Sequence, residues 1–263
     1  MTDLLRVYQA YVDTFRDSSG ELEEMLRLKL GHTMAVVDCA RRIMSGEGFA
    51  KDEFRLGEIA ALLHDTGRYA QFKKYRTFRD AVSVDHAAYS AEVVERLRWL
   101  DGFPAEDREC VLTAVRCHNR KTLPAGLPPR VERVAHLVRD ADKLDIFRVL
   151  ENAVAGGELE SHPEIAWGLP VNAAPSSEVV EAVCAGRPVE YSWIKSLSDF
   201  VLIQVGWLYG GLHYRTALEI ARERGALEFR RGFMKSLSDS PEVDRVCDLV
   251  SDEMDRVLGR NDR

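Results

Sequence analysis

The spacing of apolar residues constrains the fold of this chain more than any other feature of the sequence. Apolar side chains recur mostly three and four positions apart, which is the spacing of amphipathic helices. No stretch shows the sustained alternation of apolar and polar residues that is typical of strands. The sequence therefore predicts an all-α fold, with helices over about 4–16, 22–45, 52–65, 84–100, 105–118, 130–151, 176–185, 192–209, 213–224, 227–237 and 241–258.

The composition is that of an ordinary globular protein. The 263 residues are 46% hydrophobic and 30% charged, which is enough to bury a sizeable core. The formal net charge of -7 argues against broad electrostatic binding of nucleic acids. Five scattered cysteines without a Cys-x-x-Cys pair argue against a disulfide framework and against a thiolate zinc site.

No stretch approaches the ~18 consecutive apolar residues that a membrane-spanning helix needs. The first residues, Met-Thr-Asp-Leu-Leu-Arg, contain no apolar signal core. We therefore expect a cytoplasmic protein that does not have a membrane as a partner.

Residues 152–175 interrupt the helical pattern. They are rich in glycine and proline and have weak periodicity, so we expect a long loop or a lid there. This interruption predicts a helical core over 1–151 and a C-terminal helical extension over 176–263. The largely apolar run over 200–209 favours packing of the extension on the core rather than an independent domain.

His64 and Asp65 directly follow an apolar stretch, in the sequence Ala-Ala-Leu-Leu-His-Asp-Thr-Gly-Arg. A carboxylate at the end of such a stretch is costly to bury without a partner. A divalent metal ion held by both side chains is the best reason for this pair.

Other expected helices also carry a titratable residue where their apolar face predicts an apolar one. Helical spacing turns these residues toward the interior. They are His32, His86, His118, Asp142 and Asp145. Asp142 and Asp145 are about one turn apart, and geometry favours Asp142 as a metal ligand with Asp145 behind it. The alternative is that these acids form ion pairs with neighbouring Arg139, Lys143 or Arg148.

Histidine and aspartate ligands without thiolates suit Mn, Fe, Co, Ni, Zn or Mg. We expect one or two such divalent ions. They would activate water near neutral pH.

The order His32, His64-Asp65, Asp142 resembles the H…HD…D motif of the HD-domain superfamily of metal-dependent phosphohydrolases. The Leu-Leu-His-Asp-Thr-Gly-Arg context and the run Asp-Ala-Asp-Lys-Leu-Asp add to the resemblance, which covers about 25–151. It implies an all-helical bundle that holds one metal ion with these four residues. It also implies a catalytic role for Asp65.

Some members of the superfamily use two further histidines to bind a second metal, and His86 and His118 match their positions. The resemblance therefore implies a binuclear subtype in which Asp65 bridges the two ions. Cys117-His118 stands where the HD-GYP subgroup has paired histidines, and no Gly-Tyr-Pro follows. Hydrolysis of cyclic-di-GMP is consequently not expected.

Substrate-binding residues are predicted from positive charge near the motif. Arg68 matches the Lys or Arg of HDxG(K/R), which implies a catalytic and phosphate-binding role; an exposed arginine at a helix end is the alternative. Lys73 and Lys74 begin a basic cluster that forms either a positive rim for an anionic substrate or a solvated loop. Arg215 is a candidate phosphate contact from the second helical block, where a plain helix start is the alternative. His162, in the long interruption, is a weaker candidate.

Together these features favour a metal-dependent phosphohydrolase, a phosphomonoesterase or phosphodiesterase that cleaves an ester of a nucleotide or related small molecule. A diiron oxygenase that uses O₂ is the first alternative, because some proteins with a similar ligand set have that activity. A nucleotide-sensing module without catalysis is the second. A homodimer is left open by the sequence.

Overall fold

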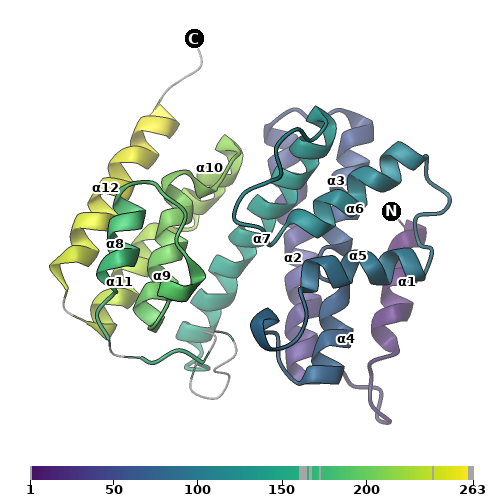
Figure 1. The fold of residues 1–263 in the computed structure, drawn as a ribbon, viewed down its shortest axis with the longest axis horizontal. Helices are drawn as coiled ribbons and strands as arrows, with labels where there is room; N and C mark the ends of the chain where they lie inside the picture. Colours follow the sequence, from purple (N-terminus) through teal and green to yellow (C-terminus); the bar gives the residue numbers. More distant parts are fainter. Residues whose placement is uncertain (1, 160–164, 166–167, 172, 239, 260–263) are drawn as a thin grey trace. The chain divides into compact units, whose positions relative to one another are not determined.

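The computed structural model describes residues 2–159, 165, 168–171, 173–238 and 240–259. Within these ranges it contains helices and their connections and no strand (Figure 1), which confirms the predicted all-α class. The α-helices are α1 (Thr2–Asp13), α2 (Glu24–Gly46), α3 (Lys51–Leu63), α4 (Thr66–Tyr75), α5 (His86–Arg96), α6 (Ala105–Cys117), α7 (Pro129–Ala155), α8 (Ser177–Cys184), α9 (Leu197–Gly206), α10 (Arg215–Glu223), α11 (Ala226–Leu237) and α12 (Pro241–Gly259).

The chain forms two compact units, Met1–Asp145 and Ile146–Arg263, and the division falls inside α7. The expected helix end at 151 is wrong, because α7 continues to Ala155 and shortens the expected loop. Packing of 176–263 on the core stays a prediction. His162 lies outside the described residues.

Unit 1 is held together by the apolar faces of its helices. Helix α3 packs against α2 and α6, and α5 packs against α4 and α6. Val36, Ile43, Ile59, Leu63 and Val111 are fully or almost fully buried in this core. Burial of each such side chain stabilises the fold by about 1.5–3 kcal/mol.

Helix α4 is not among the predicted helices. Its sequence, Thr-Gly-Arg-Tyr-Ala-Gln-Phe-Lys-Lys-Tyr, contains too few apolar residues for a helical stripe to stand out. Its inner face is instead partly aromatic and polar: Tyr69 is fully buried, and its hydroxyl lies 3.1 Å from that of Tyr8 in α1. Because α4 begins directly after His64-Asp65, the dipeptide occupies the junction of two helices.

Unit 2 contains α8 to α12. Helix α9 is buried along almost its whole length, as the apolar run predicts. The expected single helix over 192–209 is wrong: a short 3₁₀ turn (Tyr191–Trp193) precedes α9, and a π-helical turn (Trp207–Gly211) follows it. At the kink Gly210 has a φ of 114°, which glycine adopts without the strain that a side chain brings.

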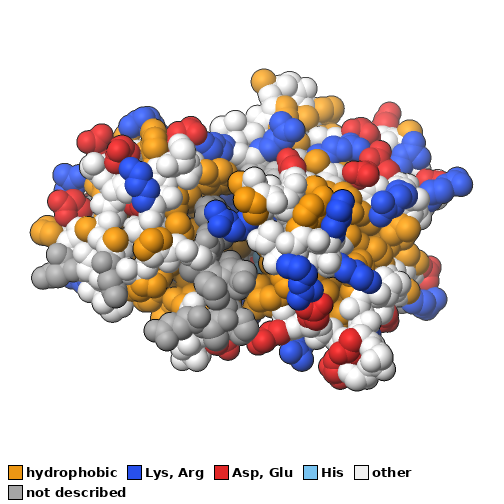
Figure 2. Space-filling model, turned by 60° about the horizontal axis from the view of Figure 1, so that its bottom comes forward, with side chains coloured by type: hydrophobic (Ala, Val, Ile, Leu, Met, Phe, Trp, Pro, Cys, Tyr) orange, Lys and Arg blue, Asp and Glu red, His pale blue; other side chains and the backbone are white. Residues whose placement is uncertain are grey.

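No helix among the described residues combines the length and the apolarity that crossing a membrane requires. Figure 2 shows Lys and Arg side chains interspersed with Asp and Glu on the face it presents.

Gly67 allows α4 to approach α5 closely. A Cβ atom added at this position would lie 2.7 Å from the backbone nitrogen of Ser90 and 2.9 Å from the carbonyl carbon of Tyr89. The Gly67 N–H donates to the Ser90 hydroxyl at 2.9 Å, and that hydroxyl donates to the carbonyl of His86 at 2.7 Å. The glycine of the His-Asp-Thr-Gly sequence therefore lets α4 pack directly against the backbone of α5.

We expect Gly67→Ala to lower the free energy of unfolding by about 1–3 kcal/mol, because the new methyl group meets backbone atoms that cannot move aside. Thermal unfolding measures this effect. Gly31→Ala is the matched control: Gly31 lies in helix α2 and a Cβ there meets nothing within 4 Å. An unchanged melting temperature in Gly67→Ala would contradict the close approach.

Candidate metal centre

The structure brings together all six predicted metal ligands inside unit 1. Five of them are buried and Asp142 is partly exposed. His32 comes from α2, His64 from the C-cap of α3, Asp65 from the N-cap of α4, His86 from the first position of α5, His118 from the C-cap of α6 and Asp142 from α7.

One oxygen of Asp65 faces the first group of ligands. Asp65 Oδ2 lies 3.6 Å from His32 Nε2 and 3.6 Å from His64 Nε2. Asp142 Oδ1 lies 3.1 Å from His32 Nε2 and 3.8 Å from His64 Nε2. The two ring nitrogens are 3.3 Å apart. Four ligand atoms therefore converge on one small region.

The other oxygen of Asp65 faces a second group. Asp65 Oδ1 lies 3.7 Å from His86 Nε2 and 3.7 Å from His118 Nε2, and these two nitrogens are 3.0 Å apart. Oδ1 is buried and accepts no hydrogen bond from the described residues, and Arg68 Nε lies 3.5 Å from it. Asp65 thus lies between two pairs of imidazoles, with one oxygen directed at each.

The Nδ1 atom of every histidine in the cluster is held by an acceptor outside it. His32 Nδ1 donates to Asp145 Oδ2 at 2.7 Å, and His86 Nδ1 donates to Asp80 Oδ2 at 2.5 Å. His64 and His118 each donate to the backbone carbonyl three residues earlier, at 2.7 and 2.8 Å. These bonds leave Nε2 as the ligand atom in each ring, because an acceptor on Nδ1 fixes both the tautomer and the orientation of a metal-binding histidine. Asp145 lies behind His32, as expected.

Burial sets the charge state of the second group. It lowers the pKa of His86 to about 4 and that of His118 to about 4, so both rings are neutral near pH 7. With both Nδ1 atoms protonated, two Nε2 lone pairs face each other at 3.0 Å. That arrangement is repulsive unless a cation lies against both nitrogens.

In the first group, the effects of burial and of neighbouring charges on the pKa values differ from residue to residue. Burial lowers the pKa of His64. Burial also acts to lower the pKa of His32, but the hydrogen bonds that its ring donates to Asp142 and Asp145 outweigh this effect and raise the pKa overall. Burial acts to raise the pKa of Asp65, yet Lys29 and the surrounding cationic groups hold it well below its usual value. Asp65 is therefore a carboxylate at neutral pH.

These residues fit divalent metal ions. Bonds of about 2.1 Å to nitrogen and oxygen place neighbouring ligand atoms about 3.0–3.5 Å apart. The spacings of 3.0–3.8 Å in both groups are close to that range. Asp65 Oδ1, which accepts no hydrogen bond from the described residues, and the opposed Nε2 atoms of His86 and His118 are the features that a bound cation would satisfy.

The sequence analysis did not identify two residues that lie in the site, Lys29 and Asp80. Lys29 Nζ donates to Asp65 Oδ2 at 2.8 Å, and Asp80 accepts from both His86 and Arg68. Lys29 stands three residues before His32, so helical spacing could have placed it on the same face. Asp80 belongs to a short 3₁₀ turn, for which the apolar pattern has no signal.

Of the predicted substrate-binding residues, one lies in the site, two lie on the surface of α4 and one lies in unit 2. Arg68 lies in the site, with Nε 3.5 Å from Asp65 Oδ1. Lys73 and Lys74 are exposed near the end of α4, where their ammonium groups lie over the rings of Phe15 and Tyr75. Arg215 is in unit 2 and donates to Glu219 and to the carbonyls of 257 and 258. The substrate-binding roles stay predictions.

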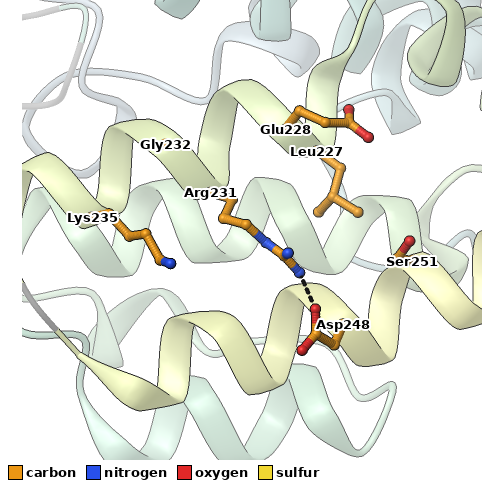
Figure 3. Close-up of a pocket in the computed structure, with 7 residues that line it drawn as sticks. All are labelled: Leu227, Glu228, Arg231, Gly232, Lys235, Asp248 and Ser251. Carbon is orange, nitrogen blue, oxygen red and sulfur yellow. Dashed lines mark hydrogen bonds and ion pairs between the residues drawn. The ribbon is translucent and has the colours of Figure 1, made fainter.

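Unit 2 has a separate pocket of about 290 Å³ between α11 and α12 (Figure 3). The close-up shows Arg231 reaching toward Asp248, to which its guanidinium donates. Lys235 forms an ion pair with Asp244 at 2.8 Å. Because acids neutralise both cations, this pocket does not favour an anionic ligand.

The fold and the cluster define an all-helical protein with a histidine and aspartate site suited to divalent metals. Residues 30–146 match the family model of the HD domain. This part of the chain, less than half of its 263 residues, is therefore similar to HD domains, and the histidine and aspartate cluster within it is compatible with a metal site. Neither a curated protein nor a solved structure matches the chain closely enough to count as similar.

We expect Asp145→Asn to weaken metal binding by about 10–100-fold, because the amide is a poorer acceptor for the His32 N–H that sets the ring's orientation. Titration of the metal-free protein with Zn²⁺ or Mn²⁺ measures this loss. Asp38→Asn is the control, an exposed acid on α2 that pairs with Arg41. Equal affinities in the wild type and Asp145→Asn would show that Asp145 does not orient His32.

Proposed function

We propose that this protein is a binuclear metal-dependent phosphohydrolase that cleaves a phosphate ester of a nucleotide or of a related small molecule. The observation that carries the proposal is the position of Asp65, whose two oxygens each face a different pair of imidazole Nε2 atoms. A single metal site would not need ligands on both sides of one carboxylate.

Divalent ions held by His32, His64, Asp65 and Asp142 on one side and by His86, His118 and Asp65 on the other would supply Lewis-acid chemistry and activate water at neutral pH. The residues of the chain prepare this chemistry. The Nδ1 hydrogen bonds fix four rings before any ligand arrives, so little reorganisation is needed on binding.

Positive charge around the centre supports an anionic substrate. Lys29 and Arg68 both lie beside Asp65, and the exposed Lys73 and Lys74 follow on α4. Such a distribution raises the local concentration of a phosphate ester. Arg215 has less support as a phosphate contact, because its described partners include the last carbonyls of α12.

The number of metal ions is the first test. We expect the wild-type protein to bind two ions per chain and His118→Ala to retain about one, because the first group keeps all its ligands. Elemental analysis after metal loading gives the ratio. The control is His213→Ala, which removes an exposed histidine of unit 2. One ion per chain in the wild type would contradict the binuclear proposal.

The second test is activity. We expect metal-loaded protein to hydrolyse members of a panel of phosphomonoesters and phosphodiesters that includes nucleotides. Asp65→Ala should lower the rate by at least about 100-fold, because both groups lose their shared ligand. Asp38→Ala serves as the control for removal of an acid. Failure to cleave any member of the panel, or full activity in Asp65→Ala, would refute the proposal.

The same screen, repeated with iron-loaded protein, distinguishes the proposed hydrolase from the diiron oxygenase that is its alternative. Iron-loaded protein that consumes O₂ with a phosphonate or polyol substrate, and that leaves every phosphate ester intact, would replace the hydrolase. The ligand residues alone fit both chemistries, so the assay decides between them.

A further inference from the structure

Lys29 has one anionic partner among the described residues, and that partner is the central carboxylate of the site. Its Nζ donates to Asp65 Oδ2 at 2.8 Å. The side chain is only 16% exposed, and Nζ also lies 5.5 Å from the centre of the Phe78 ring. The lysine is therefore held inside the site by the same oxygen that faces His32 and His64.

Arg68, the cation that the sequence motif favours for phosphate binding, uses one of its terminal nitrogens to bind protein acceptors. Its Nη1 atom donates to Gln71 Oε1 at 2.9 Å, to the carbonyl of Phe78 at 2.6 Å and to Asp80 Oδ1 at 3.0 Å. Asp80 in turn holds His86. The guanidinium thus connects α4 to the 78–80 segment through Nη1, while its Nε lies 3.5 Å from Asp65 Oδ1 and has no hydrogen-bond partner among the described residues.

Metal binding changes the surroundings of these two cations unequally. An ion held by His32, His64 and Asp142 would also take Asp65 Oδ2, the only acid oxygen that Lys29 contacts within the described part of the chain. A divalent cation beside an ammonium group repels it strongly in a buried site. The long flexible stem lets the ammonium turn to another anion, whereas Arg68 keeps its acceptors.

We propose that Lys29 is the residue that binds the phosphoryl oxygens of the substrate, and that it exchanges the Asp65 carboxylate for this phosphate when metal binds. The proposal rests on the proposed phosphohydrolase function and names the group that recognises its substrate. The ammonium already lies within hydrogen-bond distance of a metal-ligand oxygen, so an anion at the metal centre is within its reach. Charge-assisted contacts of this kind are the strong hydrogen bonds of phosphate sites.

Inorganic phosphate tests the contact without turnover. Calorimetric titration of the Mn²⁺-loaded protein should show that Lys29→Met weakens phosphate binding by about tenfold or more. Lys29→Arg should restore most of the affinity, because it keeps the charge. Lys51→Met, which removes an exposed lysine at the start of α3, is the control and should bind phosphate as the wild type does.

Titration of the metal-free proteins with Mn²⁺ alone separates substrate binding from a structural role. Lys29→Met should bind Mn²⁺ at least as tightly as the wild type, because the metal no longer has to displace the ammonium. Weaker Mn²⁺ binding would overturn the proposal, since it would mean that Lys29 positions Asp65 for the metal. If Lys29→Met does not fold, as judged by its thermal unfolding, Lys29→Gln carries the same expectations.

Unchanged phosphate affinity in Lys29→Met, or no phosphate binding by the loaded wild type, would also overturn the proposal. Both titrations are independent of hydrolysis. A protein that cleaves no ester but shows the Lys29 effects would refute the proposed function alone, and an active hydrolase without them would refute the role of Lys29 alone.

Discussion

The arrangement of unit 1 depends on one constraint: the buried carboxylate of Asp65 needs positive charge and hydrogen-bond donors around it. Asp65 is 2% exposed, and its charge is costly in the interior unless cations surround it. Lys29 lies against one oxygen, while the other has two imidazoles and Arg68 Nε near it and accepts no hydrogen bond from the described residues. The helices of unit 1 are arranged so that their polar ends and inward-facing residues meet at this one group.

The same local device positions two of the ligands. His64 caps the C-terminus of α3 and His118 caps that of α6, and each ring donates Nδ1–H to a carbonyl of its own last turn. Such a bond uses a carbonyl in the last turn of a helix, where the regular backbone pattern ends, and it directs Nε2 away from the helix. Gly67 adds to this arrangement, because it lets α4 and α5 come together and so brings His86 opposite His118.

The sequence was sufficient for the all-α class, which follows from periodicity. Periodicity and the resemblance to HD domains also singled out the six residues that the structure brings together, and their role as metal ligands stays a prediction. The sequence was insufficient where structure arises from tertiary contacts. Helix α4 has no apolar stripe of its own, and Asp80 acts from a turn that only its hydrogen bonds to Arg68, Gln71 and His86 define. The commitment of Arg68 to protein acceptors could not be read from its place in the motif, and neither could the contact between Lys29 and Asp65.

Anomalous X-ray diffraction from crystals grown with Mn²⁺ tests the central claim most directly, since it locates each ion relative to Asp65. The account predicts two peaks. One should lie within bonding distance of Asp65 Oδ2 and the Nε2 atoms of His32 and His64, and the other within bonding distance of Asp65 Oδ1 and the Nε2 atoms of His86 and His118. A single peak, or peaks that do not contact Asp65, would contradict the account.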